Sequence, residues 1–178
     1  MVIHNCNFCN GQLKETFEND QIKVGTCTIC GMKQQYNFDH IDSKLYTTNE
    51  NLPSNFREER IRQQPWNFAR FNLLQNCLYK LNDKSVIDYG CGTGAFLEYS
   101  KNKFKSIIGF DVSQEACDIN NNDKLYCVSD INLINQNKYD ILTMFHVLEH
   151  IKDPVEFLKQ VMEIDAEYFA VEVPHTNE

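Results

Sequence analysis

Hydrophobic and polar positions change their period along the chain, and after residue 85 short apolar segments alternate with helical ones. Five apolar segments, at about 85–89, 106–111, 124–129, 139–145 and 168–173, have the length and composition of buried strands. Helical patterns lie between them at about 95–101, 114–121 and 154–162. The last has a clear start, with Asp153 as N-cap, Pro154 in the first turn and Glu156 three residues after the cap. This alternation predicts a parallel α/β sheet.

A further helix is predicted to begin near Pro65, a good first-turn residue. Apolar side chains then recur every three to four residues and predict one apolar face, made by Trp66, Ala69 or Arg70, Leu73/Leu74, Cys77/Leu78 and Leu81. On this pattern Trp66 and Arg70 are candidates for packing and solvation. Residues 41–64 are polar, contain Pro53 and show little apolar periodicity. We interpret them as a linker or as a mobile segment that covers another part of the molecule.

The first forty residues contain two Cys-x-x-Cys pairs separated by seventeen residues. This spacing is typical of a structural zinc site, with iron as a possible substitute, and its ligands are Cys6, Cys9, Cys27 and Cys30. Four thiolates complete a tetrahedral shell and leave no position for a reactive water, so the site is predicted to be structural. The alternatives are two coincidental pairs or redox-active dithiols. His4 and His40 are surplus to a four-Cys set and are expected on the surface.

The rest of this segment has too few large apolar residues to fold without a metal ion. Short antiparallel strands are expected at about 12–17 and 21–26, around a turn at Asn19-Asp20. The other four cysteines (Cys77, Cys91, Cys117 and Cys127) are interpreted as small apolar fillers. Residues 1–40 are therefore predicted to form a small zinc-ribbon-like module.

Composition and charge argue against several classes of function. The net charge of −8 and pI near 5.1 argue against a nucleic-acid-binding protein, which needs a basic surface. The residues before the first Cys pair have neither the basic start nor the apolar run typical of a signal peptide, and no apolar run approaches the roughly 20 residues of a membrane-spanning helix. The chain is expected to be soluble and cytoplasmic.

The first candidate for chemistry is a glycine-rich loop after the first predicted strand of the sheet. The strand contains Asp88, and Gly90, Gly92 and Gly94 follow before a helix. Glycines allow tight backbone geometry and close approach of a ligand, and the helix start offers free N–H groups. The spacing Gly90-x-Gly92-x-x-Ala95 also satisfies a dinucleotide fingerprint, so the loop alone leaves a nicotinamide enzyme open.

Three later features favour another cofactor. Asp111 closes the second strand, where it could accept from both ribose hydroxyls, and Asp130 follows the third, where it could accept from an adenine amino group. The run His-Val-Leu-Glu-His-Ile-Lys-Asp-Pro at 146–154 follows the fourth strand. The set resembles the class I S-adenosylmethionine-dependent methyltransferases. It is most similar to a branch with an N-terminal four-Cys zinc module and an HVLEH-x-x-DP run, in which several members methylate nucleotide-linked sugars or other small metabolites.

The resemblance implies an α/β fold, a Rossmann-like sheet with about five parallel strands after the zinc module. It also implies roles for individual residues. Asp88 and the three glycines would cradle the methionine part of the cofactor, Asp111 would hold the ribose, and Asp130 with the Ile131 backbone would contact the adenine. Phe145 and His146 would line the pocket near the sulfonium, and His146 is the candidate base for an acceptor that must lose a proton. Glu149 and His150 are expected to fix the loop, and the segment 46–70 could close over the cofactor carboxylate.

The expected function is therefore S-adenosylmethionine-dependent methylation of a small molecule, a sugar or nucleotide-linked sugar. The alternatives are an RNA methyltransferase, which the acidic charge disfavours, and a non-catalytic cofactor-binding or interaction module. Three units are expected: a zinc module at 1–40, the linker at 41–64 and a methyltransferase domain at 65–178. The resemblance implies two more strands after the fifth, so we expect either a truncated product or a fifth-strand edge that a partner chain or a second copy completes.

Overall fold

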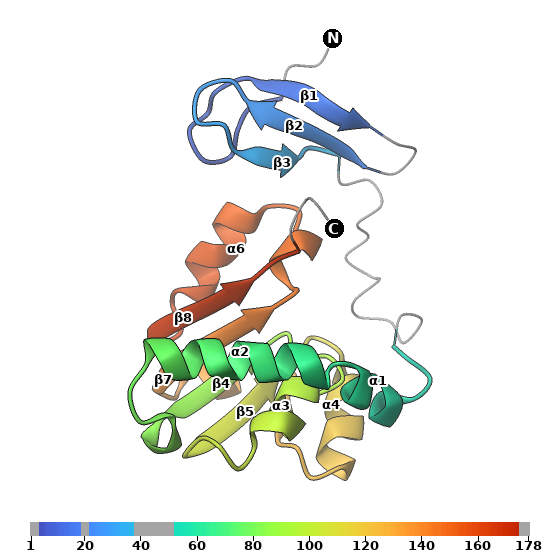
Figure 1. The fold of residues 1–178 in the computed structure, drawn as a ribbon, viewed down its shortest axis with the longest axis vertical. Helices are drawn as coiled ribbons and strands as arrows, with labels where there is room; N and C mark the ends of the chain where they lie inside the picture. The colour runs from blue at the N-terminus through green and yellow to red at the C-terminus, as the bar shows by residue number, and fades with distance from the viewer. Residues whose placement is uncertain (1–3, 19–21, 38–51, 175–178) are drawn as a thin grey trace.

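The computed structural model describes residues 4–18, 22–37 and 52–174. In Figure 1 the N-terminal segment forms a small sheet of its own, and the remaining elements surround a larger one. The small sheet has the antiparallel order β1 (Leu13–Glu18), β2 (Lys23–Cys27) and β3 (Lys33–Gln35). We call residues 4–37 the four-Cys module. The predicted turn at Asn19-Asp20 and His40 lie outside the described residues.

The larger sheet confirms the predicted class. Its five strands are all parallel, in the order β6-β5-β4-β7-β8. Their bounds are β4 (Ser85–Tyr89), β5 (Ser106–Phe110), β6 (Cys127–Val128), β7 (Tyr139–Phe145) and β8 (Ala166–Glu172). The chain builds outward from β4 through β5 to β6 and then crosses to β7 on the other side. The direction of winding therefore reverses between β4 and β7, the place where open α/β sheets bind ligands.

Apolar side chains of β4 and β7 alternate between two clusters on opposite faces of the sheet. Ile87 and Leu142 point to a cluster that includes Val161 and is covered by α5 (Ile131–Asn135) and α6 (Pro154–Val161). Val86 and Ile141 point to a second cluster, covered by α2 (Gln64–Cys77) and α3 (Ala95–Ser100). Helix α4 (Gln114–Asn122) contacts β6, and the 3₁₀ turns η3 (Leu81–Asp83) and η4 (Leu148–His150) precede β4 and follow β7. Burial on both faces explains why these strands read as continuous apolar runs.

Three predictions about elements were wrong or incomplete. Helix α1 (Phe56–Arg62) occupies part of the region that we interpreted as a linker, and residues 41–51 of that region are outside the described chain. The third strand is much shorter than predicted, because Lys124 has a φ of +63° and the Leu125 N–H donates to the Asn120 carbonyl. The structure also adds α5, which the sequence analysis did not predict.

The inward face of α2 also differs from the prediction. Its buried residues are Asn67, Arg70 and Leu74, whereas Trp66 and Leu73 are more than half exposed. Arg70 is 8% exposed and therefore is not a solvated residue. The error has a physical cause: the apolar period was counted on one face of the helix, while the buried face carries two polar side chains with specific partners. Within the described part of the chain, no helix is both long enough and apolar enough to cross a membrane.

Candidate functional site

The glycine loop after β4 is shaped by left-handed backbone and by close neighbours. Gly90 and Gly94 have φ values of +75° and +73°. A Cβ atom at Gly90 would lie 2.4 Å from Val147 Cγ2, and one at Gly94 would lie 2.3 Å from Asn120 Oδ1, so both positions require glycine. Gly92 differs, because a Cβ there would meet nothing within 4 Å. Open space therefore borders the middle of the loop, as a cradle for a ligand needs.

Two predicted carboxylates lie at the carboxyl ends of β4 and β5. Asp88 is buried, and its Oδ1 accepts from Thr143 Oγ1 at 2.7 Å. Burial raises the pKa of Asp88 to about 6, although the Thr143 hydroxyl favours the ionised form. Asp111 accepts from the backbone N–H groups of Gly92 at 2.7 Å and Ser113 at 2.9 Å. Burial also raises the pKa of Asp111, against these two hydrogen bonds. Asp111 thus ties the start of α4 to the middle of the glycine loop.

The predicted adenine contact follows β6, at the carboxyl-terminal edge of the parallel sheet. Asp130 is exposed and caps α5, accepting from the Asn132 N–H at 2.9 Å. Ile131 begins that helix and packs against the cluster between α5, α6 and the sheet. The Asp130 carboxylate therefore has a local structural partner as the cap of α5, and its contact with adenine stays a prediction.

Phe145 and His146 mark the end of β7, across the winding reversal from the glycine loop. The Phe145 ring packs edge-to-face on Phe96, with centroids 4.9 Å apart, and lies 4.6 Å beneath the Arg70 guanidinium. His146 has a left-handed φ of +57°, and its N–H donates to the Glu172 carbonyl at 3.0 Å. This backbone turn directs the half-exposed imidazole toward two carboxylates.

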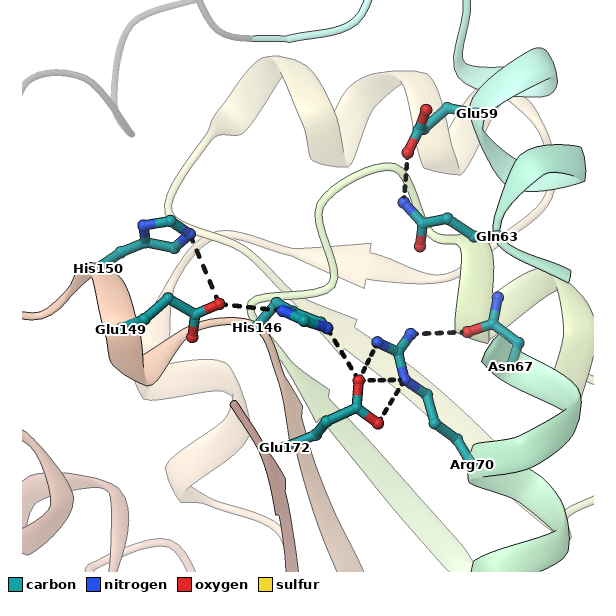
Figure 2. Close-up of polar contacts among 8 residues, drawn as sticks. All are labelled: Glu59, Gln63, Asn67, Arg70, His146, Glu149, His150 and Glu172. Atoms are coloured by element: carbon teal, nitrogen blue, oxygen red, sulfur yellow. Dashed lines mark hydrogen bonds and ion pairs between the residues drawn. The ribbon is translucent and has the colours of Figure 1, made fainter. Parts of the chain in front are cut away.

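Figure 2 shows the resulting polar network. His146 Nδ1 lies 3.0 Å from Glu149 Oε1, and His146 Nε2 lies 2.9 Å from Glu172 Oε1. Glu172 also receives the guanidinium of Arg70, whose Nε is 3.0 and 3.1 Å from the two carboxylate oxygens. His150 Nε2 lies 4.0 Å from Glu149 Oε1. The network can hold a positively charged imidazole between two carboxylates, because both ring nitrogens then donate.

The inward side of α2 supplies two polar groups from the segment 46–70, which we expected could close over the cofactor carboxylate, although neither residue was given a contact of its own. Arg70 Nη1 donates to Asn67 Oδ1 at 3.0 Å, and Asn67 is fully buried. Among the described residues, Asn67 Nδ2 has no hydrogen-bond partner. Since a buried amide rarely stays unpaired, this donor is suited to receive an acceptor from a ligand. The available signal was an Asn and an Arg three residues apart in an otherwise apolar helix.

A third residue without a predicted contact supports the loop from α1. Arg60 is 4% exposed, and its guanidinium donates to the Thr93 carbonyl at 2.6 Å and to Asn120 Oδ1 at 2.9 Å. It also pairs with Asp123 at 2.6 Å. Asn120 in turn donates to the Gly92 carbonyl at 2.9 Å. Arg60 and Asn120 therefore hold the glycine loop from behind, and we call this group the loop clamp.

The four predicted metal ligands come together in the four-Cys module. Their Sγ atoms all lie within 4.8 Å of one another, and two pairs are 3.7 Å (Cys6–Cys30) and 3.4 Å (Cys9–Cys27) apart. A tetrahedral ion with Zn–S bonds of about 2.3 Å would place its sulfurs about 3.8 Å apart. Each Cys pair also folds alike: the N–H of Phe8 donates to Cys6 Sγ and that of Ile29 to Cys27 Sγ, both at 3.4 Å. The cluster fits a zinc ion.

Comparisons with known proteins agree with this geometry. A family model described as a methyltransferase domain matches residues 56–170. The ubiquinone biosynthesis O-methyltransferase of Nitrosomonas europaea is 28% identical over 106 residues, which cover 52% of this chain and 44% of that protein. That of Coxiella burnetii is 30% identical over 88 residues, covering 44% of this chain and 38% of the relative. The chain thus matches less than half the length of these relatives.

The fold has a solved counterpart. An S-adenosylmethionine-dependent methyltransferase from Archaeoglobus fulgidus superposes with a TM-score of 0.51 at 22% identity, over 70% of this chain and 60% of that one. The matched family segment starts at Phe56, so it includes α1 and its clamp residue Arg60, and it ends within β8. The sheet, the glycine loop and the family match all lead to the same conclusion: the chain belongs to the methyltransferase-domain family.

Proposed function

We propose that the chain transfers a methyl group from S-adenosylmethionine to a hydroxyl group of a small molecule. The observation that carries the proposal is the position of the loop and of His146 on either side of the winding reversal, within a family-matched domain. The relatives are named O-methyltransferases, which supports an oxygen acceptor. The zinc module and the HVLEH-x-x-DP run support a sugar or nucleotide-linked sugar as the acceptor.

The residues around the loop suit the cofactor. Gly90, Gly92 and Gly94 would receive its methionine part, and Asp111 would accept from the ribose hydroxyls. Arg70 and the Asn67 Nδ2 atom, which has no partner in the described part of the chain, offer donors for the methionine carboxylate. The bound cofactor supplies an electrophilic methyl group on a sulfonium. The protein contributes alignment and exclusion of water, which can be worth about 7–11 kcal/mol.

His146 is the residue that we propose accepts the proton of the acceptor hydroxyl. Its ring is 46% exposed, so an acceptor can reach it, and Glu149 and Glu172 would stabilise the imidazole once it is charged. His146→Gln is expected to reduce turnover by about 10²–10⁴-fold. Binding of S-adenosylhomocysteine should stay within a few-fold. His150→Gln is the matched control, and equal turnover in wild type and His146→Gln would contradict this role.

The cofactor and the acceptor are tested separately. Calorimetry with S-adenosylhomocysteine and with NAD separates a methyltransferase from a nicotinamide enzyme, and we expect binding of the first alone. Labelled S-adenosylmethionine is then incubated with pools of nucleotide sugars, of phenolic quinone precursors and of RNA. Transfer to sugars supports the acceptor class proposed here, and transfer to phenols or RNA replaces it. Binding without transfer to any pool would favour the non-catalytic module.

We also propose that the four-Cys module holds structural Zn²⁺. With four thiolates the ion has no open position, so its contribution is to the folding of the module. A partner strand on the β8 edge stays a prediction: in the described chain β8 pairs with β7 alone, and Tyr168, Phe169 and Val171 are 40–45% exposed.

A further inference from the structure

Glu172 at the end of β8 is shared between two cationic partners that serve different parts of the proposed site. Arg70 forms a two-pronged contact with its carboxylate, through Nε to both oxygens and through Nη2 to Oε1. His146 Nε2 lies 2.9 Å from the same Oε1 atom. Figure 2 shows the carboxylate between the guanidinium and the imidazole. One oxygen therefore bridges the residue proposed for the cofactor carboxylate and the residue proposed for the acceptor proton.

Arg70 and His146 differ in how strongly they interact with the Glu172 carboxylate. Burial opposes ionisation of Glu172, but the hydrogen bonds and charge of Arg70, together with His146, outweigh it and lower the pKa of Glu172. Four groups face or adjoin the His146 ring: Glu172 from β8, Arg70 behind Glu172 from α2, and Glu149 and His150 from η4. While Arg70 is paired with Glu172, the positive charge of Arg70 offsets part of the stabilisation that Glu172 gives to a charged His146.

A carboxylate that arrives at Arg70 must compete with Glu172. The guanidinium fork fits one carboxylate in the bidentate geometry, and Nη1 is already bonded to Asn67. We propose that the carboxylate of the bound cofactor displaces Glu172 from Arg70 toward His146, so that Glu172 is a positioning residue that makes His146 a stronger base only when the cofactor is present. This inference rests on the proposed function. Glu172 would couple cofactor binding at Arg70 to protonation of His146. Because such coupling is reciprocal, protonation of His146 must in turn strengthen cofactor binding.

Proton uptake on ligand binding tests this linkage. The full chain is titrated with S-adenosylhomocysteine near neutral pH in buffers of different ionisation enthalpy. We expect net proton uptake, because an imidazole binds protons more tightly when the negative charge beside it increases. 5′-Methylthioadenosine is the matched ligand, since it has the adenosine and thioether but no carboxylate. It should bind without uptake.

Two variants separate the coupling from a structural role. Glu172→Gln is nearly isosteric and removes the competing charge, so we expect it to bind S-adenosylhomocysteine about 3–10-fold more tightly with no proton uptake. His146→Gln should also lose the uptake. Thermal unfolding checks that both variants are folded. A purely structural Glu172 would instead give weaker binding with uptake unchanged, and this would overturn the inference.

The outcomes distinguish the inference from the function on which it rests. If S-adenosylhomocysteine does not bind to the wild-type chain, the proposed function fails and the inference fails with it. If the compound binds with the same heat in every buffer, the proposed function stands and the linkage through Glu172 is wrong. Equal uptake with 5′-methylthioadenosine would likewise overturn the linkage, because the carboxylate would then have no part in it.

Discussion

The four-Cys module and the five-stranded domain reach a folded state by different means. The buried apolar residues of the module are Cys6, Leu13 and Cys27, two of which are proposed metal ligands. The domain has two apolar clusters, one on each face of its sheet, and a polar site at the sheet edge. The two regions therefore differ in what we expect to unfold them. The module is expected to depend on one metal ion. The core of the domain is large enough to hold buried charged side chains next to their partners.

Removal of the metal should have the largest effect and should be confined to the module. Structural zinc contributes about 10–16 kcal/mol of apparent binding free energy in small zinc domains, so a chelator or Cys9→Ser should unfold residues 4–37. Metal content by mass spectrometry and proteolysis within the module measure the loss. Cys77→Ser, at an exposed thiol of α2, is the control. Protease resistance of the metal-free module, or collapse of the domain with it, would remove the contrast between the regions.

The domain should be most sensitive at the loop clamp. Arg60→Ala leaves Asn120 and the Thr93 carbonyl without a buried donor and should lower the free energy of unfolding by about 2–4 kcal/mol. S-adenosylhomocysteine affinity should fall with it, because the glycine loop loses its support. Arg62→Ala on the same helix is the matched control, since Arg62 is exposed and pairs with Glu59 at the surface. Denaturant titration and calorimetry compare the two, and similar losses in both variants would show that the clamp has no special role.

At Asp88 we expect substitution to raise the free energy of unfolding at neutral pH, whereas the substitutions above lower it. The Asp88 pKa of about 6 in the folded chain is above the ordinary value of 3.8, so ionisation opposes folding. The wild-type chain should match Asp88→Asn in stability below about pH 4 and lose stability relative to it as pH rises through about 6. The difference should reach about 2–3 kcal/mol near pH 8, while cofactor affinity falls in the variant. Asp118→Asn on the exposed side of α4 controls for the change in net charge. A pH-independent difference would contradict the burial argument.

The smallest expected effect tests which face of α2 is buried. Leu73→Ser should change the free energy of unfolding by less than about 0.5 kcal/mol, because Leu73 is 64% exposed. The neighbouring Leu74, at 5% exposure, should cost about 2–5 kcal/mol when changed to alanine. Chemical denaturation of both variants decides between the observed helix face and the face that the apolar period predicted. Equal losses would favour the predicted one.

The site was predictable where one residue type is required by local backbone or by chain order. Gly90 and Gly94 follow from the left-handed turn, and Asp88 and Asp111 follow from their places at the ends of β4 and β5. Arg60 and Arg70 were not predictable in the same way, because each is separated in sequence from its partners: Arg60 reaches Thr93, and Arg70 reaches Glu172. An arginine in a helical pattern is usually solvated, and only its partners show that it is buried.

The sequence by itself determined the parallel sheet, the glycine loop and the four clustered cysteines, because hydrophobic period, backbone freedom and Cys-x-x-Cys spacing are local properties. The tertiary structure decided that α2 turns Asn67 and Arg70 inward, that α1 clamps the loop, and that Glu172 stands between Arg70 and His146. These features depend on which distant charges meet in a buried site. Local patterns cannot express this choice, since the free energy of a buried ion depends on partners that the fold brings together.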